Sequence, residues 1–221
     1  MSFTTWVEPL LGRQYRCPTG LLGQAVGAKM VRQHAPETAW TISLLEITPA
    51  DRVLEIGFGA GRAIELIAAQ TPQCSIAGID LSPTMVRVSS RRNAQAIKAG
   101  RVKLRQGDVE RMPFQDSQFD KLLSIQALYF WPDPQRAVAE IARVLAPEGR
   151  LALTFSPGKV DEQPNEHIQQ TVEQIIASMK GMGFTSAEVK PGPNSRQFQT
   201  AAVIGVKGTG GYRVPEGGNR A

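Results

Sequence analysis

Short apolar runs typical of strands alternate with helical patterns through about a hundred residues of this chain. Strands are predicted at residues 52–56, 75–79, 102–106, 119–125 and 150–155, and helices at 61–70, 82–98 and from 133 onward. Strands separated by crossover helices pair in parallel and are covered on both faces. The order therefore predicts a mostly parallel sheet with helices on both faces, joined by right-handed crossovers.

Local signals define the ends of these elements. Ser82 and Pro83 suit the first positions of the second helix, and Gly100 is expected to end it in the left-handed conformation. The next helix starts at Asp133-Pro134, and a turn at residues 147–149 leads into the fifth strand. The side chains of that helix expected to face the core are Val138, Ile141 and Leu145.

The pattern changes after residue 155. A helix at 164–180 is followed by two strand patterns, 186–190 and 201–207, with only a loop rich in Pro, Gly and Asn between them. Consecutive strands joined in this way usually pair antiparallel. Residues 208–221 are rich in glycine and poor in apolar side chains, so they are expected to form a disordered tail.

The first part of the chain predicts an arm and a helical cap over residues 1–48, in front of a main domain at 49–207. One helix is expected at 21–34 and a second from Pro36-Glu37. Their inward apolar positions would be Leu22, Val26 and Met30 in the first, and Trp40, Leu44 and Leu45 in the second.

Composition narrows the class of protein. A chain of 221 residues, 42% hydrophobic and 20% charged, can bury one sizeable core. It has no apolar run near the roughly 20 residues that cross a bilayer and no signal-peptide pattern, so we expect a cytoplasmic protein without a membrane span. Cys17 and Cys74 lack metal-site spacing, so we expect reduced thiols and no metal.

The formal net charge of +5 would permit binding to nucleic acid. Lys and Arg are scattered along the chain, however, and only Arg91-Arg92 forms a close pair. We therefore read the charge as solvated helix faces and expect no nucleic-acid partner. No oligomeric state is predicted.

The stretch VLEIGFGAGR, residues 53–62, carries three alternate glycines directly after the first strand. Gly57, Gly59 and Gly61 lie where an open parallel sheet places its ligand crevice, and glycine lets a ligand lie against the main chain. The dinucleotide fingerprint G-x-G-x-x-G would need a glycine at position 62, which is Arg62.

Three acidic residues accompany this loop. Glu55 precedes it, Asp80 ends the second strand in GIDLSP, and Asp108 follows the third strand in RQGDVERMPF. Each lies at the carboxyl edge of the predicted sheet, so the crevice should be acidic. An acidic crevice suits a cation better than a diphosphate.

From VLEIGFGAG, GIDLSPTMV, GDVERMPFQDSQFDKLLSIQALYFWPDP and ARVLAPEGRLALTF, residues 49–155 resemble the class I S-adenosylmethionine-dependent methyltransferases. The resemblance is to the bacterial small-molecule subgroup that includes quinone-pathway enzymes. It implies an α/β Rossmann-like, doubly wound seven-stranded sheet of order 3-2-1-4-5-7-6 with strand 7 antiparallel. It also implies methyl transfer from S-adenosylmethionine to a small-molecule acceptor by in-line displacement.

The resemblance assigns cofactor contacts along the crevice. Glu55 would orient the methionine part, Asp80 would hold the ribose hydroxyls, and Asp108 would accept from the adenine amino group. The remaining positions implied to bind the cofactor are Gly57, Phe58, Gly59, Gly61, Leu81, Met85, Val109 and Gln126.

Acceptor contacts are expected from Tyr15, His34, Tyr129 and Trp131, and no catalytic residue is assigned. Tyr129 and Trp131 would form an apolar wall or pack under the following helix. His34 would act as a base or as a surface charge at a helix end; His167 is a weaker candidate.

Two other functions remain open at this point. One is a nicotinamide-linked oxidoreductase on a related fold, which Arg62 disfavours; the other is a non-catalytic relative that binds only the cofactor. Nucleic-acid amino-methylases carry an Asn/Asp-Pro-Pro-aromatic signature after the fourth strand, where this chain has residues 126–129, QALY. This difference argues against methylation of nucleic-acid bases.

Overall fold

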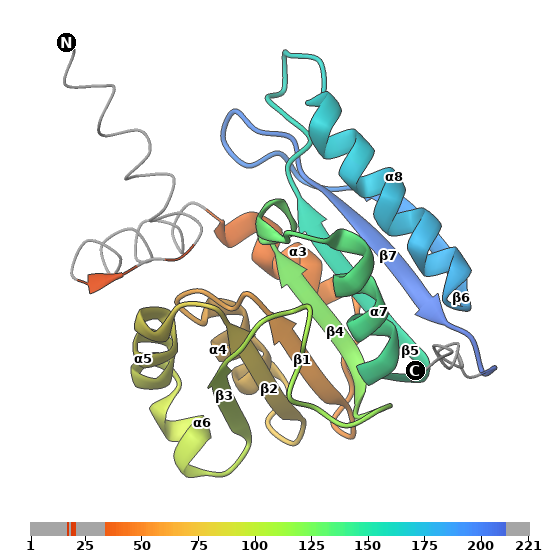
Figure 1. The fold of residues 1–221 in the computed structure, drawn as a ribbon. Helices are drawn as coiled ribbons and strands as arrows, with labels where there is room; N and C mark the ends of the chain where they lie inside the picture. The colour runs from red at the N-terminus through yellow and green to blue at the C-terminus, as the bar shows by residue number, and fades with distance from the viewer. Residues whose placement is uncertain (1–16, 18, 21–33, 211–221) are drawn as a thin grey trace, which may run out of the picture.

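The computed structural model describes residues 17, 19–20 and 34–210 (Figure 1). The expected arm with Tyr15, the helix predicted before His34 and the tail from residue 211 lie outside the described residues. Within the described part of the chain, no helix is long and apolar enough to cross a bilayer.

Seven strands form one sheet of order β3-β2-β1-β4-β5-β7-β6 (Figure 1). Strands β1 to β5 pair in parallel, whereas β7 runs antiparallel to both β5 and β6. The predicted order and the antiparallel last strand are therefore confirmed. The strands are β1 Arg52–Ile56, β2 Ser75–Asp80, β3 Val102–Gln106, β4 Phe119–Ile125, β5 Leu145–Phe155, β6 Phe184–Pro191 and β7 Ala201–Lys207.

Helices cover both faces of this sheet (Figure 1). Helices α3, α4 and α5 contact one another in series on one face, and α7 and α8 pack together on the other. Their bounds are α3 Ala35–Leu44, α4 Arg62–Gln70, α5 Pro83–Arg92, α6 Ala94–Lys98, α7 Pro134–Val144 and α8 Glu166–Gly181, with a short 3₁₀ helix η1 at Leu128–Phe130.

The core forms two layers because successive strand residues point to opposite faces. In β1, Val53 packs in the cluster that contains Ile64 of α4, whereas Leu54 packs in the cluster that contains Ile141 of α7. Leu122 and Leu123 of β4 divide in the same way. Burial on both faces explains why these strands read as continuous apolar runs.

The helix predicted over 82–98 is interrupted at Asn93 and forms α5 and α6. The buried Asn93 amide donates to the carbonyl oxygens of Gly61, at 3.1 Å, and Ser89, at 3.0 Å. The Asn93 side chain therefore links the glycine loop to the last turn of α5, at the position where the expected continuous helix is broken. Gly100 has the expected left-handed conformation, with φ 74°.

Two other boundaries differ from the prediction. Helix α7 ends at Val144, so Leu145 belongs to β5, and the turn expected at 147–149 is an irregular part of that strand. The register between β4 and β5 shifts at this place, and Glu148 has φ 62°. Helix α8 begins after Asn165, whose side chain accepts the Ile168 N–H.

Helix α3 buries a polar face rather than the apolar one predicted. Trp40 and Leu44 are only partly buried, although Leu45 is buried as expected. The buried side chains within α3 are Glu37, Thr38, Thr41 and Ile42. Thr41 Oγ1 lies 2.6 Å from Thr154 Oγ1 of β5, so a hydroxyl pair fixes this helix to the sheet.

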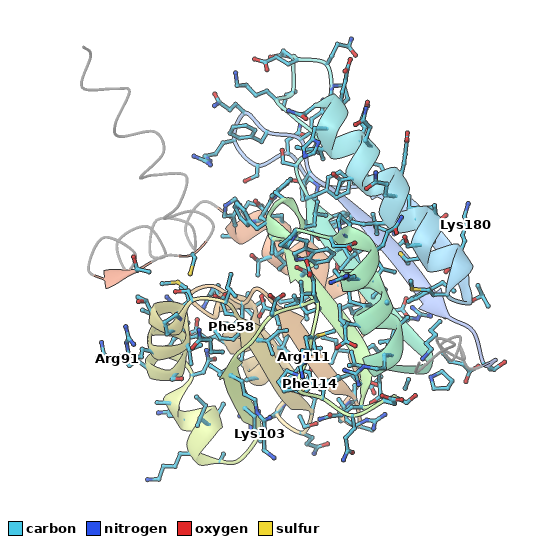
Figure 2. All side chains as sticks on the ribbon, viewed as in Figure 1. Phe58, Arg91, Lys103, Arg111, Phe114 and Lys180 are labelled. Atoms are coloured by element: carbon cyan, nitrogen blue, oxygen red, sulfur yellow. The ribbon has the colours of Figure 1, made fainter. Side chains whose placement is uncertain are left out.

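Basic side chains are spread over separate elements. Figure 2 shows Arg91 on α5, Lys103 on β3 and Lys180 on α8 at different edges of the molecule, and all three are exposed. These three charges do not form one surface, which favours the interpretation as solvated positions. The absence of a nucleic-acid partner stays a prediction.

Candidate functional site

A cavity opens at the carboxyl ends of β1, β2 and β4, where the predicted crevice lies. It is called the first cavity below. Every residue predicted to bind the cofactor lines it except Gly61, and His34 and Trp131 line it too. The predicted residues brought together here are Glu55, Gly57, Phe58, Gly59, Asp80, Leu81, Met85, Asp108, Val109 and Gln126.

Gly57, Gly59 and Gly61 have positive φ angles of 71°, 49° and 75°, respectively, but their surroundings differ. At Gly57 a Cβ would lie 2.7 Å from the Cβ of Ala127. At Gly59 a Cβ would meet no atom within 4 Å, so its open side faces free space. At Gly61 a Cβ would lie 1.9 Å from Ser89 Oγ, so this glycine makes room for α5 rather than for a ligand.

Asp80 joins the end of β2 to the glycine loop. Its Oδ2 accepts the N–H of Gly59 at 2.8 Å, and its Oδ1 accepts the N–H of Ser82 at 2.8 Å. Burial raises the pKa of Asp80, and these two hydrogen bonds oppose the rise. A carboxylate oxygen has more than one acceptor site, so each oxygen can still accept a ligand hydroxyl.

Glu55 is the buried acid beneath this loop, with 3% of its surface exposed. Burial raises its pKa to about 8, the charge of Asp80 adds to the rise, and the N–H of Ile64 opposes it. Its Oε2 has no hydrogen-bond partner among the described residues. A cationic or hydrogen-donating ligand in the cavity would supply one, which fits the methionine end of S-adenosylmethionine.

Leu81, Met85 and Asp108 also line the first cavity. Met85 is buried while Leu81 is 44% exposed, and both supply apolar surface. Asp108 is exposed, and its Oδ1 accepts the N–H of Glu110 at 3.0 Å. Together these groups suit a flat ring that carries an amino group.

Gln126 directly follows β4 and has a strained conformation, with φ 56°. Its N–H bonds the Thr154 carbonyl at 2.8 Å, and its Oε1 accepts the Tyr129 hydroxyl at 2.6 Å. The same hydroxyl accepts the N–H of Ser156. Non-glycine residues with positive φ often mark ligand sites, where surrounding contacts hold them.

Tyr129 and Trp131, which were expected to form one apolar wall, line different cavities. Trp131 is buried and lines the first cavity, together with Phe130. Tyr129 does not line that cavity; its hydroxyl is tied to Gln126 and Ser156 as described. Burial raises the pKa of Tyr129, the Ser156 N–H opposes the rise, and the charge of Glu37 adds to it.

A second cavity of about 510 Å³ adjoins the first and shares two lining residues with it, His34 and Gln126. Its volume is within the range of roughly 300–1,000 Å³ that holds small-molecule ligands. The other lining groups come mainly from the segment between β5 and α8 and from the loop between β6 and β7, and Tyr129 of η1 is also among them.

His34 is the N-cap residue of α3, and its Nδ1 lies 2.5 Å from Oε1 of Glu37. Sequence reasoning treated Glu37 only as a helix-start residue, although the spacing from His34 to Glu37 places both on one helix face. The other histidine, His167, is exposed on α8. In the described part of the chain, no cluster of three His, Cys, Asp or Glu side chains is arranged to hold a metal.

Comparisons with known proteins agree with this geometry. A family model described as "Methyltransferase domain" matches residues 54–153. The chain is 32% identical to "Uncharacterized methyltransferase YdaC" of Bacillus subtilis (strain 168), over 74% of this chain and 88% of that protein. It is 31% identical to "Ubiquinone/menaquinone biosynthesis C-methyltransferase UbiE" of Geotalea daltonii, over 77% of this chain and 76% of that one.

Solved structures share the fold at lower identity. The "[4+2]-Cyclase SpnF" superposes with a TM-score of 0.66 at 18% identity, covering 92% of this chain and 94% of that chain. A geranyl diphosphate methyltransferase in complex with S-adenosylmethionine also gives 0.66, at 16% identity over 81% and 88% of the two chains. No comparison supports the nicotinamide-linked alternative. From its sequence relatives, its glycine loop and its sheet order, the chain belongs to the class I S-adenosylmethionine-dependent methyltransferases.

Proposed function

We propose that this enzyme transfers the methyl group of S-adenosylmethionine to a small-molecule acceptor bound in the second cavity. The observation that carries the proposal is the junction of the two cavities at His34 and Gln126. A cofactor in the first cavity and an acceptor in the second would meet at these two residues. The cofactor supplies an activated methyl group, so the chain contributes mainly orientation and the exclusion of water.

The cofactor contacts follow from the groups left available in the first cavity. Asp80 would accept the two ribose hydroxyls, because each of its oxygens has a free acceptor site beyond its backbone bond. Asp108 would accept from the adenine amino group, next to the apolar Met85. Glu55, with its unpartnered Oε2, would hold the positively charged methionine end.

Gly57, Phe58 and Gly59 would form the main-chain surface under the cofactor, and Leu81, Val109 and Gln126 would bound it. Gly61 has a different part in this proposal. It would keep α5 close to the loop and so support the site without touching the cofactor.

The relatives differ by name: one is a C-methyltransferase of ubiquinone/menaquinone biosynthesis, and another is a malonyl-[acyl-carrier protein] O-methyltransferase. Membership of the family therefore supports a small-molecule acceptor without fixing which atom is methylated. A cytoplasmic location is part of the proposal; free Cys17 and Cys74 agree with a reducing compartment.

Label transfer tests the proposal. Adenosylmethionine carrying a tritiated methyl group is incubated with the full chain and a small-molecule extract of the cells that make it. Label should move into that fraction with wild-type enzyme and much less with Asp80→Ala. If adenosylmethionine binds but the label enters only protein or nucleic acid, the small-molecule proposal is wrong.

A further inference from the structure

The junction between the two cavities holds a histidine in a defined orientation. His34 lines both cavities, and its Nδ1 lies 2.5 Å from Oε1 of Glu37, which is 1% exposed. A carboxylate accepts hydrogen bonds and cannot donate them, so Nδ1 carries the proton in this contact. In the neutral ring, Nε2 then has the free lone pair.

The fold fixes Glu37 beneath this ring. Thr41, one turn later in α3, donates to the Glu37 carbonyl at 2.7 Å and contacts Thr154 of β5 at 2.6 Å. Burial acts to raise the pKa of Glu37, but the hydrogen bond from His34, with smaller contributions including one from Ser195, outweighs burial and lowers it. The carboxylate is therefore charged near neutral pH, so it can accept the hydrogen bond from Nδ1 of His34.

Most of the residues that line the second cavity are polar by type, but the larger part of the surface that they expose to it is apolar. Amide and hydroxyl side chains predominate there, and Ile168 and Phe198 are the apolar exceptions among its lining side chains. Two buried polar atoms of its lining residues, Glu37 Oε2 and Thr200 Oγ1, have no hydrogen-bond partner among the described residues. Buried polar atoms are usually satisfied, so these two predict a ligand that brings hydrogen-bonding groups of its own.

The rim of the same cavity carries further charged groups. Lys159 and Glu162 form an ion pair at 2.6 Å, and Arg196 lies on the loop before β7. These groups, with Tyr129 from η1, are the other titratable side chains that line the cavity. Of the two carboxylates that line the second cavity, Glu162 pairs with Lys159 and Glu37 contacts His34.

We infer that His34 is the general base of the reaction, that Glu37 is its positioning residue, and that the acceptor is a small molecule whose nucleophilic atom carries a proton. This inference rests on the proposed function. The proton of the acceptor passes to Nε2 of His34, and the acceptor atom forms a bond to the methyl carbon. The carbon–sulfur bond breaks, its electron pair stays on sulfur, and the leaving group is S-adenosylhomocysteine. Glu37 stabilises the imidazolium that results.

A merely structural role for this pair would be a helix cap. His34 occupies the N-cap position of α3, although its side chain bonds no backbone N–H there. A purely structural contact between His34 and Glu37 would fix the same tautomer, because the carboxylate accepts from Nδ1 in either case. The tautomer therefore tests the contact, and methyl transfer by a His34 variant tests the catalytic role.

Nuclear magnetic resonance of the full chain with ¹⁵N-labelled histidine measures that tautomer directly. The chain has two histidines, so His167→Gln assigns the spectrum. We expect neutral His34 to carry its proton on Nδ1 and to lose this preference in Glu37→Leu. Glu166→Leu, which removes an exposed carboxylate, should keep it. A spectrum in which the Nδ1 and Nε2 forms are unchanged by Glu37→Leu overturns the inference.

Binding and transfer separate this inference from the proposed function. By calorimetry, His34→Gln should bind S-adenosylhomocysteine within about threefold of wild type, while label transfer into the small-molecule extract falls ~10²–10⁴-fold. His167→Gln should leave both unchanged. Failure of wild-type enzyme to bind S-adenosylhomocysteine would reject the proposed function itself. Normal binding with undiminished transfer in His34→Gln would reject the inference alone.

Discussion

The Asp80 carboxylate bonds the backbone of Gly59 at 2.8 Å, which links two positions 21 residues apart. The end of β2 therefore fixes the conformation of the glycine loop after β1. The acid that would hold the ribose and the main-chain surface under the cofactor form one unit. A change in either should affect binding through both.

Asp80→Ala should weaken adenosylmethionine binding by at least about tenfold, because the ribose hydroxyls lose a charged acceptor and the loop loses its support. Titration calorimetry measures the change. Asp161→Ala removes an exposed carboxylate outside both cavities and should bind as wild type does. Equal affinity in the Asp80 and Asp161 variants would refute the assignment of Asp80.

Gly59→Ala should reduce cofactor affinity much more than stability. The new Cβ would point into open space, so its cost to the fold is the backbone strain of φ 49°, on the order of 1 kcal/mol. In the complex the same methyl group would occupy space that the cofactor needs. Thermal unfolding and calorimetry on one sample compare the two effects, and unchanged affinity would show that the cofactor does not lie over Gly59.

Gly61→Ala should reduce stability instead, because its Cβ would lie 1.9 Å from Ser89 Oγ and 2.8 Å from Asn93 Nδ2. Gly100→Ala is the matched control. Its φ is 74° against 75° for Gly61, but a Cβ there meets nothing within 4 Å. We expect the Gly61 variant to be less stable than the Gly100 variant by roughly 1–3 kcal/mol, as for other overpacked sites. Equal midpoints in urea would contradict the packing role.

Glu55 should make stability depend on pH. Its pKa is about 8 in the folded protein against an ordinary 4.5, so between these values the folded chain holds a proton that the unfolded chain has lost. The stabilisation is complete below about pH 4.5 and is lost as the pH rises to about 8, at up to about 1.4 kcal/mol per pH unit. Urea titrations at several pH values measure the free energy of unfolding of wild type and of Glu55→Gln. If this free energy depends on pH in the same way in both proteins, the pKa of Glu55 is not raised.

The same acid should couple cofactor binding to proton release. A cation near Glu55 favours its charged form, so adenosylmethionine should bind more tightly as the pH rises from 6 toward 8. Calorimetry in buffers with different ionisation enthalpies counts the protons released. Glu55→Gln should release fewer protons on binding than wild type does. An equal number of released protons would show that the positive charge of the cofactor does not lie near Glu55.

The sheet and the cofactor side were predictable because their signals are local. Glu55, Asp80 and Asp108 each stand next to a strand end, and parallel strands bring such ends to one edge. The break at Asn93 depends on the distant Gly61 carbonyl, and no local pattern marks it. The prediction of a continuous helix failed for that reason.

The acceptor side was less predictable because it depends on tertiary packing. Glu37 is buried since Thr41 attaches a polar face of α3 to β5, whereas the sequence pattern suggested an apolar face led by Trp40. Tyr129 and Trp131 are close in sequence yet line different cavities. That separation follows from η1, which turns the chain at the end of β4.

Calorimetric titration of the wild-type chain with S-adenosylhomocysteine, and separately with NAD, tests the central claim most directly. We predict one S-adenosylhomocysteine per chain and no measurable binding of NAD, because the first cavity offers carboxylates for a nucleoside and no glycine at position 62 for a diphosphate. Tight binding of NAD with none of S-adenosylhomocysteine would contradict the account.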